Sequence, residues 1–168
     1  KNMPKTLSEE PKDIVLNKTV VIPSGNNITL DLQAHTISYA SNTDATIQIE
    51  PGATLTIIDS IEDGTSVITY GAVQNLGGIA IKNNGTLNIG DNTDGTMYRN
   101  SPRIIGVEYA VENSADAVFN FYDGILKGIT GVYNSIVEPT IPEGYSLQEG
   151  TEVINETLTY ITKYLVIQ

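Results

Sequence analysis

Hydrophobic and polar residues alternate along the chain in short runs, and clusters of turn residues separate these runs. Runs such as ITLDL (28–32) and TLTII (54–58) are rich in β-branched residues, and the turns between runs contain Pro-Ser-Gly, Pro-Gly and Asn-Asn-Gly. A period of two with such boundaries is typical of β-strands. Helical periodicity is absent across most of the chain, and only residues 6–15 could hold a helical turn, with Thr6 or Ser8 as its N-cap. We therefore predict an all-β protein.

A sequence repeat runs through the middle of the chain, because Leu55, Leu87 and Phe119 follow one another at a constant step of 32. An earlier copy at 22–32 has a step of 27, and a partial later copy begins at 131–135. The repeat aligns three apolar columns, which are Ile22/Ile49/Ile81/Val111, Ile28/Leu55/Leu87/Phe119 and Leu30/Ile57/Ile89/Phe121. We expect these columns to face inward, and the alternate positions Thr29, Thr56, Asn88 and Asn120 to face outward.

A period of about 30 residues with two or three short strands in each repeat indicates a parallel β-solenoid, in which each repeat is one coil. A second set of apolar strands is expected at 35–40, 66–73, 102–107 and 123–129. An antiparallel β-sandwich is the rival architecture. A sandwich gives no reason for Leu-x-Ile-x-Asp to recur at equal intervals, so the repeat favours the solenoid.

The tail of the chain, residues 137–168, lacks the repeat pattern. We predict that it forms a β-hairpin that turns near Asn155-Glu156 and either caps the last coil or links to a following module. Residues 1–136 are then the parallel β-helix, of about four to five coils, with residues 1–19 as a cap at its other end. Because the chain begins at Lys1, we expect a mature form or an excised piece.

Three segments of the chain carry a resemblance to a known family. The runs IPSGNNITLDLQAHTIS (22–38), IQIEPGATLTIIDS (47–60) and IAIKNNGTLNIGD (79–91) resemble the right-handed parallel β-helix modules of bacterial surface and adhesin-like proteins. These modules belong to the pectate-lyase-like superfamily, which also contains polysaccharide lyases and hydrolases. The resemblance spans roughly residues 15–135, and it implies a right-handed β-helix at the bacterial cell surface or outside the cell.

One pair of residues departs from that family pattern. Gln33-Ala34 stands where such modules usually have Asn-Gly. Glycine adopts a left-handed turn readily, and alanine costs about 1 kcal/mol where φ is positive. We therefore expect this turn to be built differently here.

Composition and charge narrow the possible partners. The formal net charge is −11 with only nine Lys and Arg residues, so nucleic acid is not an expected partner. The absence of cysteine excludes a disulfide scaffold and a cysteine-based zinc site. No apolar run approaches the ~18 residues of a membrane span, so we expect no membrane insertion by this segment. A polysaccharide or a host or cell-surface protein remains as the expected class of partner.

Aspartates supply the candidate metal site. The repeat places Asp59, Asp91 and Asp123 at one corner, where stacked carboxylates repel unless a cation or hydrogen bonds compensate. One interpretation is a binding site for Ca²⁺, which would then be the only cofactor. The same residues could instead include a pair of glycosidase carboxylates. The other interpretation is that each aspartate caps its own turn through the backbone.

Aromatic and basic residues supply the candidate ligand site. Tyr98, Arg99 and Arg103 lie together in TMYRNSPRII, and Tyr122 is another of nine tyrosines in a chain without tryptophan. Exposed tyrosines can stack on sugars or on a protein partner, or they can fill the core instead. The single histidine, His35, lacks a partner that would make it catalytic, so we expect a corner residue and assign no catalytic residue.

Two functions remain open from the sequence. The first is a non-enzymatic binding, adhesion or spacer module of a secreted or cell-surface bacterial protein, with a glycan as a possible ligand. The alternative is a Ca²⁺-dependent polysaccharide-active enzyme, either a lyase or a glycoside hydrolase, which would use the aspartates together with Arg99 and Arg103.

Overall fold

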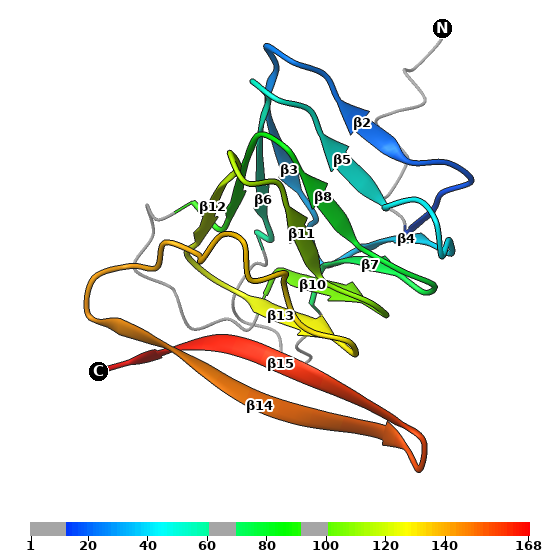
Figure 1. Ribbon diagram of the computed structural model, residues 1–168, viewed down its shortest axis with the longest axis vertical. Coiled ribbons are helices and arrows are strands. Elements are labelled where there is room, and N and C mark those ends of the chain that lie inside the picture. The colour runs from blue at the N-terminus through cyan, green and yellow to red at the C-terminus, as the bar shows by residue number, and fades with distance from the viewer. Residues whose placement is uncertain (1–12, 61–69, 92–100) are drawn as a thin grey trace, which may run out of the picture.

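The computed structural model describes residues 13–60, 70–91 and 101–168, and every helix or strand in these ranges is a β-strand. Figure 1 shows the strands stacked from β2 and β3 at the top to a long hairpin at the bottom. The strands are β1 (Ile14–Val15), β2 (Val20–Ile22), β3 (Asn27–Asp31), β4 (Thr36–Tyr39), β5 (Ile47–Ile49), β6 (Thr54–Ile58), β7 (Ala72–Asn75), β8 (Ile81–Asn83), β9 (Thr86–Ile89), β10 (Arg103–Gly106), β11 (Val111–Asn113), β12 (Val118–Phe121), β13 (Ile125–Gly128), β14 (Tyr145–Asn155) and β15 (Leu158–Ile167). No helix in the described ranges is long and apolar enough to cross a membrane.

The chain passes through three sheets in a fixed order. Sheet A contains β1, β4, β7, β10 and β13 followed by the hairpin strands, sheet B contains β2, β5, β8 and β11, and sheet C contains β3, β6, β9 and β12. The strands of the repeat pair with one another only in parallel. We call one pass, such as β5–β6–β7, a rung. The predicted all-β class and parallel strands are confirmed, and the antiparallel sandwich is excluded.

Sheet C has the register that the repeat predicts. Leu55 pairs with Ile28 on one side and with Leu87 on the other, and Leu87 pairs with Phe119. The next column runs through Leu30, Ile57, Ile89 and Phe121, and Ile57, Ile89 and Phe121 are fully buried. Burial of these two apolar columns stabilises the stack of strands.

The alternate positions of sheet C form a polar ladder on its outer side. Asn120 Nδ2 donates to Asn88 Oδ1 at 2.7 Å, and Asn88 Nδ2 donates to Thr56 Oγ1 at 3.1 Å. All three side chains are partly exposed. The predicted outward orientation of this column is therefore confirmed, and the side-chain amides add hydrogen bonds between rungs.

The predicted apolar column of sheet B is wrong, because its register shifts by two positions between β5 and β8. Ile49 pairs with Asn83, and Ile81 pairs with Ile47. The reason is the turn between sheets B and C, which spans 50–53 in one rung but only 84–85 in the next. The actual columns are Val20/Ile47/Ile81/Val111 and Ile22/Ile49/Asn83/Asn113.

Buried asparagines take the place of isoleucine in the second of these columns. Asn83 Nδ2 donates to Asn113 Oδ1 at 2.9 Å and to the Val118 carbonyl at 3.0 Å. Asn83 Oδ1 accepts from the Gly85 amide at 3.1 Å. These bonds satisfy polar groups in the short turn, which explains why a polar residue is stable in an inward column.

Sheet A follows the second set of predicted strands. β4, β10 and β13 lie within their predicted ranges, whereas β7 begins at Ala72 and the predicted residues 66–69 lie outside the described residues. Val73, Ile104 and Leu126 form its buried inward column.

The C-terminal residues form the predicted hairpin. β14 pairs with β15 antiparallel around Glu156-Thr157, and β15 pairs antiparallel with β13. The hairpin therefore extends sheet A, while Leu147, Ile161 and Leu165 pack against the core. Residues 1–12, with most of the predicted N-terminal cap and helical turn, lie outside the described residues, and Ile14–Val15 is a strand. The division at residue 136 stays a prediction.

Candidate functional site

The outer face of sheet A carries a groove, which we call the sheet A groove. The pairing register places Arg103, Ile125 and Tyr164 in one row across β10, β13 and β15, and Lys127 beside Thr162 in the next. These side chains point away from the core because they alternate with the buried Ile104 and Leu126. The groove has a volume of about 390 Å³ and is lined by Arg103, Ile125, Lys127, Thr151, Glu152, Thr162 and Tyr164.

An ion pair crosses the groove. Lys127 on β13 is only 6% exposed, and its ammonium donates to the Glu152 carboxylate on β14, with β15 between the two strands. A buried ammonium needs an anionic partner, because desolvation without one is strongly unfavourable. The pair therefore ties the hairpin to the last rung and places a fixed carboxylate at the wall of the groove.

Arg103 is stacked on an aromatic ring. Its guanidinium carbon lies 4.0 Å from the centroid of the Tyr70 ring, a distance at which a cation–π interaction is favourable. The stacked guanidinium is held flat at one end of the groove, with its donors in a fixed plane. Tyr164 supplies the aromatic surface at the other strand of the same row.

The predicted ligand-binding residues are divided by the fold. Tyr98 and Arg99 lie outside the described residues. Arg103 is the first residue of β10 and lines the groove, whereas Tyr122 directly follows β12 of sheet C and is not among the groove residues. Their roles in binding stay a prediction.

The hairpin residues of the groove were missed from the sequence. Thr151, Glu152, Thr162 and Tyr164 come from the tail, which was interpreted as a cap or a linker. One feature of the sequence points to these residues. Tyr160, Thr162 and Tyr164 alternate along the chain, which places three side chains with hydroxyl groups on one face of a strand. Their proximity to Arg103 and Lys127 depends on contacts between segments that lie far apart in the sequence.

Two of the three predicted metal aspartates have their carboxylates bonded to turns. Asp59 is 8% exposed, and it accepts from the Ala34 amide at 2.7 Å and from the Gly71 amide at 2.6 Å, one bond to each oxygen. Asp123 Oδ1 accepts from the Gly124 amide at 2.7 Å. Asp91 is exposed at the same corner.

Only the Asp123 bond, to the amide of the next residue, fits an aspartate that caps its own turn. Asp59 instead bonds the amides of Ala34 and Gly71, which lie outside its own turn. No group of three or more His, Asp or Glu side chains in residues 13–60, 70–91 and 101–168 could hold a metal ion. Calcium binding by the Asp59, Asp91 and Asp123 column stays a prediction from the repeat.

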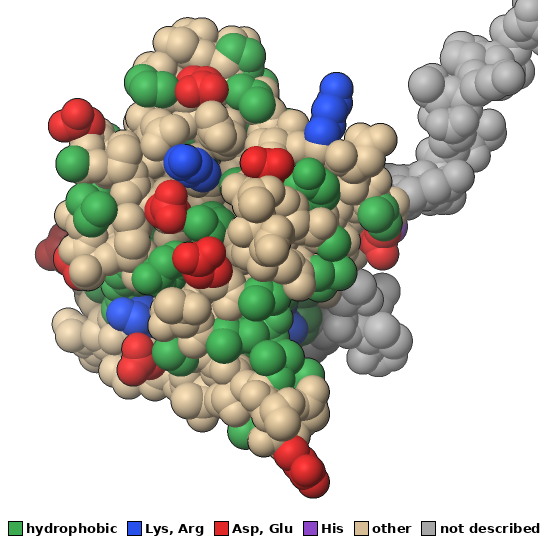
Figure 2. Space-filling view, turned by 45° about the vertical axis from the view of Figure 1, so that its right-hand side comes forward, with side chains coloured by type: hydrophobic (Ala, Val, Ile, Leu, Met, Phe, Trp, Pro, Cys, Tyr) green, Lys and Arg blue, Asp and Glu red, His purple; other side chains and the backbone are tan. Residues whose placement is uncertain are grey.

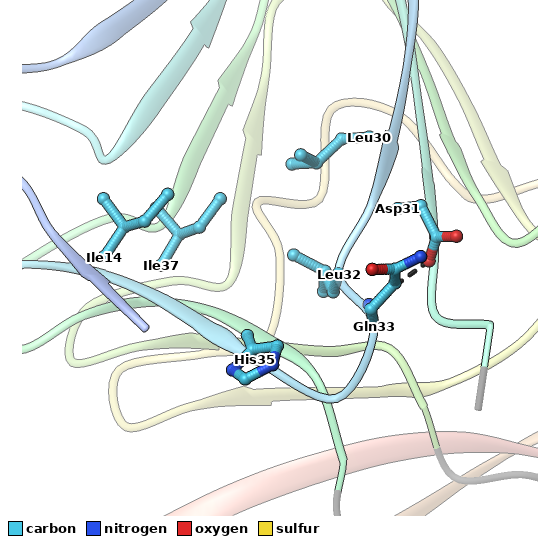
Figure 3. Close-up of a pocket in the computed structure, with 7 residues that line it drawn as sticks. All are labelled: Ile14, Leu30, Asp31, Leu32, Gln33, His35 and Ile37. Atoms are coloured by element: carbon cyan, nitrogen blue, oxygen red, sulfur yellow. Dashed lines mark hydrogen bonds between the residues drawn. The ribbon is translucent and has the colours of Figure 1, made fainter. Parts of the chain in front are cut away.

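A second hollow, the N-terminal pocket, lies at the first rung (Figure 3). It is lined by Ile14, Leu30, Asp31, Leu32, Gln33, His35 and Ile37, and has a volume of about 230 Å³. His35 lies between β3 and β4, at the corner where we expected it, and its Nδ1 is 3.2 Å from Asp13 Oδ1. The hydrogen bonds from the Thr36 amide and from His35 lower the pKa of Asp13 below its ordinary value. Nothing in this arrangement supplies a nucleophile for His35 to activate.

The corner beside His35 forms a left-handed turn without a glycine. Gln33 has a φ of 46° and Ala34 a φ of 63°. Three hydrogen bonds hold the turn: the Gln33 amide donates to Asp31 Oδ1, the Ala34 amide to Asp59, and the His35 amide to the Leu32 carbonyl. The chain thus forms a left-handed turn without glycine and stabilises it with aspartate side chains. The expected difference from the turn of the family stays a prediction.

Acidic residues outnumber basic ones in the chain, which has a formal net charge of −11. Figure 2 shows acidic side chains spread over one face and few basic ones, and hydrophobic side chains gathered in the lower half of the view. In this acidic chain, the sheet A groove is lined by two basic residues, Arg103 and Lys127, and one acidic residue, Glu152, which pairs with Lys127. Comparison with known proteins assigns no function to either hollow, because no family model, no curated protein and no solved structure matches the chain.

Proposed function

We propose that this chain is a non-enzymatic binding module of a secreted or cell-surface bacterial protein, and that it binds a glycan in the sheet A groove. The single observation that carries the proposal is the row Arg103–Ile125–Tyr164 beside the Lys127–Glu152 pair. This row combines an aromatic ring, an aliphatic side chain and fixed charged groups on one open surface.

The chemistry of these groups fits a sugar. Tyrosine and isoleucine present flat apolar area to the C–H face of a sugar ring, and the tyrosine hydroxyl stays available for a hydrogen bond. The guanidinium of Arg103 carries several donors and the carboxylate of Glu152 several acceptor positions, so each can bond a sugar hydroxyl in addition to the contacts it already makes. A groove of about 390 Å³ lies at the lower end of the range for small-ligand sites, and suits one or two sugar units.

We further propose that the three sheets are the faces of a right-handed parallel β-helix of the pectate-lyase-like superfamily, with four to five coils. The fixed order in which the chain visits the sheets and the parallel register support this proposal. The family resemblance of residues 22–38, 47–60 and 79–91 adds the handedness and the location at the bacterial surface.

A glycan array followed by calorimetry on the best ligand tests the binding function. We expect Arg103→Ala and Tyr164→Ala each to weaken binding at least about tenfold, which corresponds to about 1.4 kcal/mol. Lys82→Ala and Tyr39→Ala are matched controls, because these residues lie outside the groove. We expect the controls to bind as the unchanged chain does.

Two outcomes would overturn the proposed function. One is the absence of binding to any glycan on the array. The other is turnover of a polysaccharide panel by the purified chain, which would favour the Ca²⁺-dependent enzyme. We do not propose that enzyme, because both carboxylate oxygens of Asp59 already bond backbone amides.

A further inference from the structure

We propose that the N-terminal end of the stack is a docking surface for another β-coil of the kind this chain repeats, supplied by a second polypeptide. We call this surface the N-terminal edge and define it by β2, β3 and the N-terminal pocket. Within the described residues, β2 and β3 are the terminal strands of sheets B and C, and each has a neighbour on one side only.

The N-terminal edge exposes backbone groups in an ordered row. The Val20 amide donates to Thr46 and the Leu32 amide donates to Ile58, so these residues point their amides at the second rung. Successive residues of a parallel strand alternate between its two neighbours. The amides of Val21 and Thr29 therefore point away from the second rung, toward the open side of the stack.

The same edge exposes apolar side chains. Ile14, Val20, Val21 and Ile28 are 39–48% exposed, and they make up four of the eleven large hydrophobic residues found exposed in the described ranges. Leu30, Leu32 and Ile37 line the pocket behind them (Figure 3). Neither β2 nor β3 contains a lysine or a proline, the residues that usually protect an edge strand from pairing.

The interior of the stack identifies the occupant. Each later rung presents an equivalent surface, and in each case a parallel rung covers it: β2 and β3 cover β5 and β6, which in turn cover β8 and β9. The columns of Val20, Ile28 and Leu30 continue that interface outward. A coil with apolar residues alternating with Thr or Asn at these columns therefore fits the N-terminal edge.

A second copy of this chain cannot supply such a coil in the same orientation. The opposite end of its stack is followed by further chain, since Tyr133 bridges to Val111 and Thr140 bridges to Asn120 in parallel. Val132, Tyr133, Val137 and Ile141 pack against the core there. A second copy in the same orientation is therefore excluded. The occupant that we propose is a coil from another polypeptide, and self-association in a different orientation is an alternative that the test separates.

The probe is a fluorescent synthetic peptide with the sequence of residues 46–59, TIQIEPGATLTIID, which forms β5 and β6. We expect saturable binding of this peptide to the full chain, and no binding of a peptide with the same composition in scrambled order. The double variant Val21→Pro/Thr29→Pro removes two outward amides without touching the bonds to the second rung. We expect it to bind the peptide at least tenfold more weakly.

Matched control variants distinguish a loss of pairing at the N-terminal edge from a loss of folding. Val21→Thr/Thr29→Ser keeps both amides, and we expect it to bind as the unchanged chain does. If the proline variant unfolds, Val20→Lys serves instead, because it places a charge on the edge and leaves the backbone unchanged. We expect the same loss of peptide binding from Val20→Lys.

Three results would overturn the proposal. They are equal binding by the proline, lysine and control variants; dimerisation of the full chain, by sedimentation, that the proline variant abolishes; and peptide binding only after removal of residues 1–12. The second result would identify a second copy as the occupant, and the third would identify the chain's own first residues.

Discussion

Gln33 and Ala34 show how side chains can hold a backbone conformation that usually calls for glycine. Both have positive φ, and alanine has no side-chain group with which to stabilise the left-handed region. The bond from the Ala34 amide to Asp59, at 2.7 Å, connects this corner to the turn of the next rung. Ala34 is therefore stabilised from outside its own segment, whereas Gln33 is stabilised by Asp31 within it.

Replacing Ala34 with glycine tests this explanation. We expect Ala34→Gly to raise the free energy of unfolding by about 1 kcal/mol, because glycine adopts a φ of 63° without strain and keeps the amide. Urea unfolding of the variant measures the change. Ala53→Gly is the control: Ala53 is buried and its φ is not in the positive region, so we expect it to lower stability. A loss of stability in Ala34→Gly would contradict the explanation.

Among the elements, the short turn at 84–85 accounts for the register of sheet B. It shifts the register of β8 by two positions relative to the sequence repeat, and brings Asn83 into an inward column. The buried side-chain amide then bonds the Gly85 amide and the Val118 carbonyl. The turn and the asparagine therefore belong together.

Removing the Asn83 side chain should be more damaging than removing an asparagine from the outer ladder. We expect Asn83→Ala to lower the free energy of unfolding by about 2–3 kcal/mol, because it leaves several buried polar groups without partners. Asn88→Ala removes two bonds at a partly exposed position, and we expect a loss of about 1 kcal/mol or less. Chemical denaturation of both variants provides the comparison, and equal losses would argue against the special role of Asn83.

The strands and the sheet C columns could be predicted from the sequence because apolar residues of sheet C recur at a step of 32, although the turns between the strands differ in length. Leu55, Leu87 and Phe119 are examples. Sheet B could not be placed correctly, because Ile81 and Asn83 are both plausible partners of Ile49 until the length of the turn is known. The groove could not be predicted for another reason. Lys127 and Glu152 come together only because the C-terminal hairpin pairs with β13, and the alternation of residues does not show which strand the hairpin pairs with.

At the scale of the whole molecule, the last rung and the hairpin are joined through Tyr133. Its ring packs edge-on against Phe119 with centroids 5.8 Å apart, and the Lys163 ammonium of β15 lies 4.6 Å from the centroid of the Tyr133 ring. Burial raises the pKa of Tyr133 above 10.0, although the hydrogen bond and the charge of Lys163 oppose this rise. The folded state therefore favours the neutral phenol.

This shift predicts a loss of stability in alkali. Because the folded pKa of Tyr133 lies above the unfolded value of 10.0, its contribution is complete below pH 10.0 and is lost as the pH rises through the folded pKa. We expect the difference in unfolding free energy between the unchanged chain and Tyr133→Phe to be constant below pH 10.0 and to shrink above it. Urea unfolding of both proteins across this range measures the difference. A difference that stays constant in alkali would contradict the assignment.

The parallel stacking of the rungs also sets the height of the molecule. Each rung adds one strand spacing, about 4.8 Å, to the height of the stack, whatever the length of the turns that connect its strands. The short turn at 84–85 and the longer turn at 50–53 both connect sheets B and C without a break in the parallel pairing. Duplication of one repeat unit would therefore lengthen the molecule by a fixed increment and create no new kind of interface. The height of the stack depends on the number of repeat units, whereas the outer surface depends on the length and sequence of the turns. The two properties can therefore evolve separately.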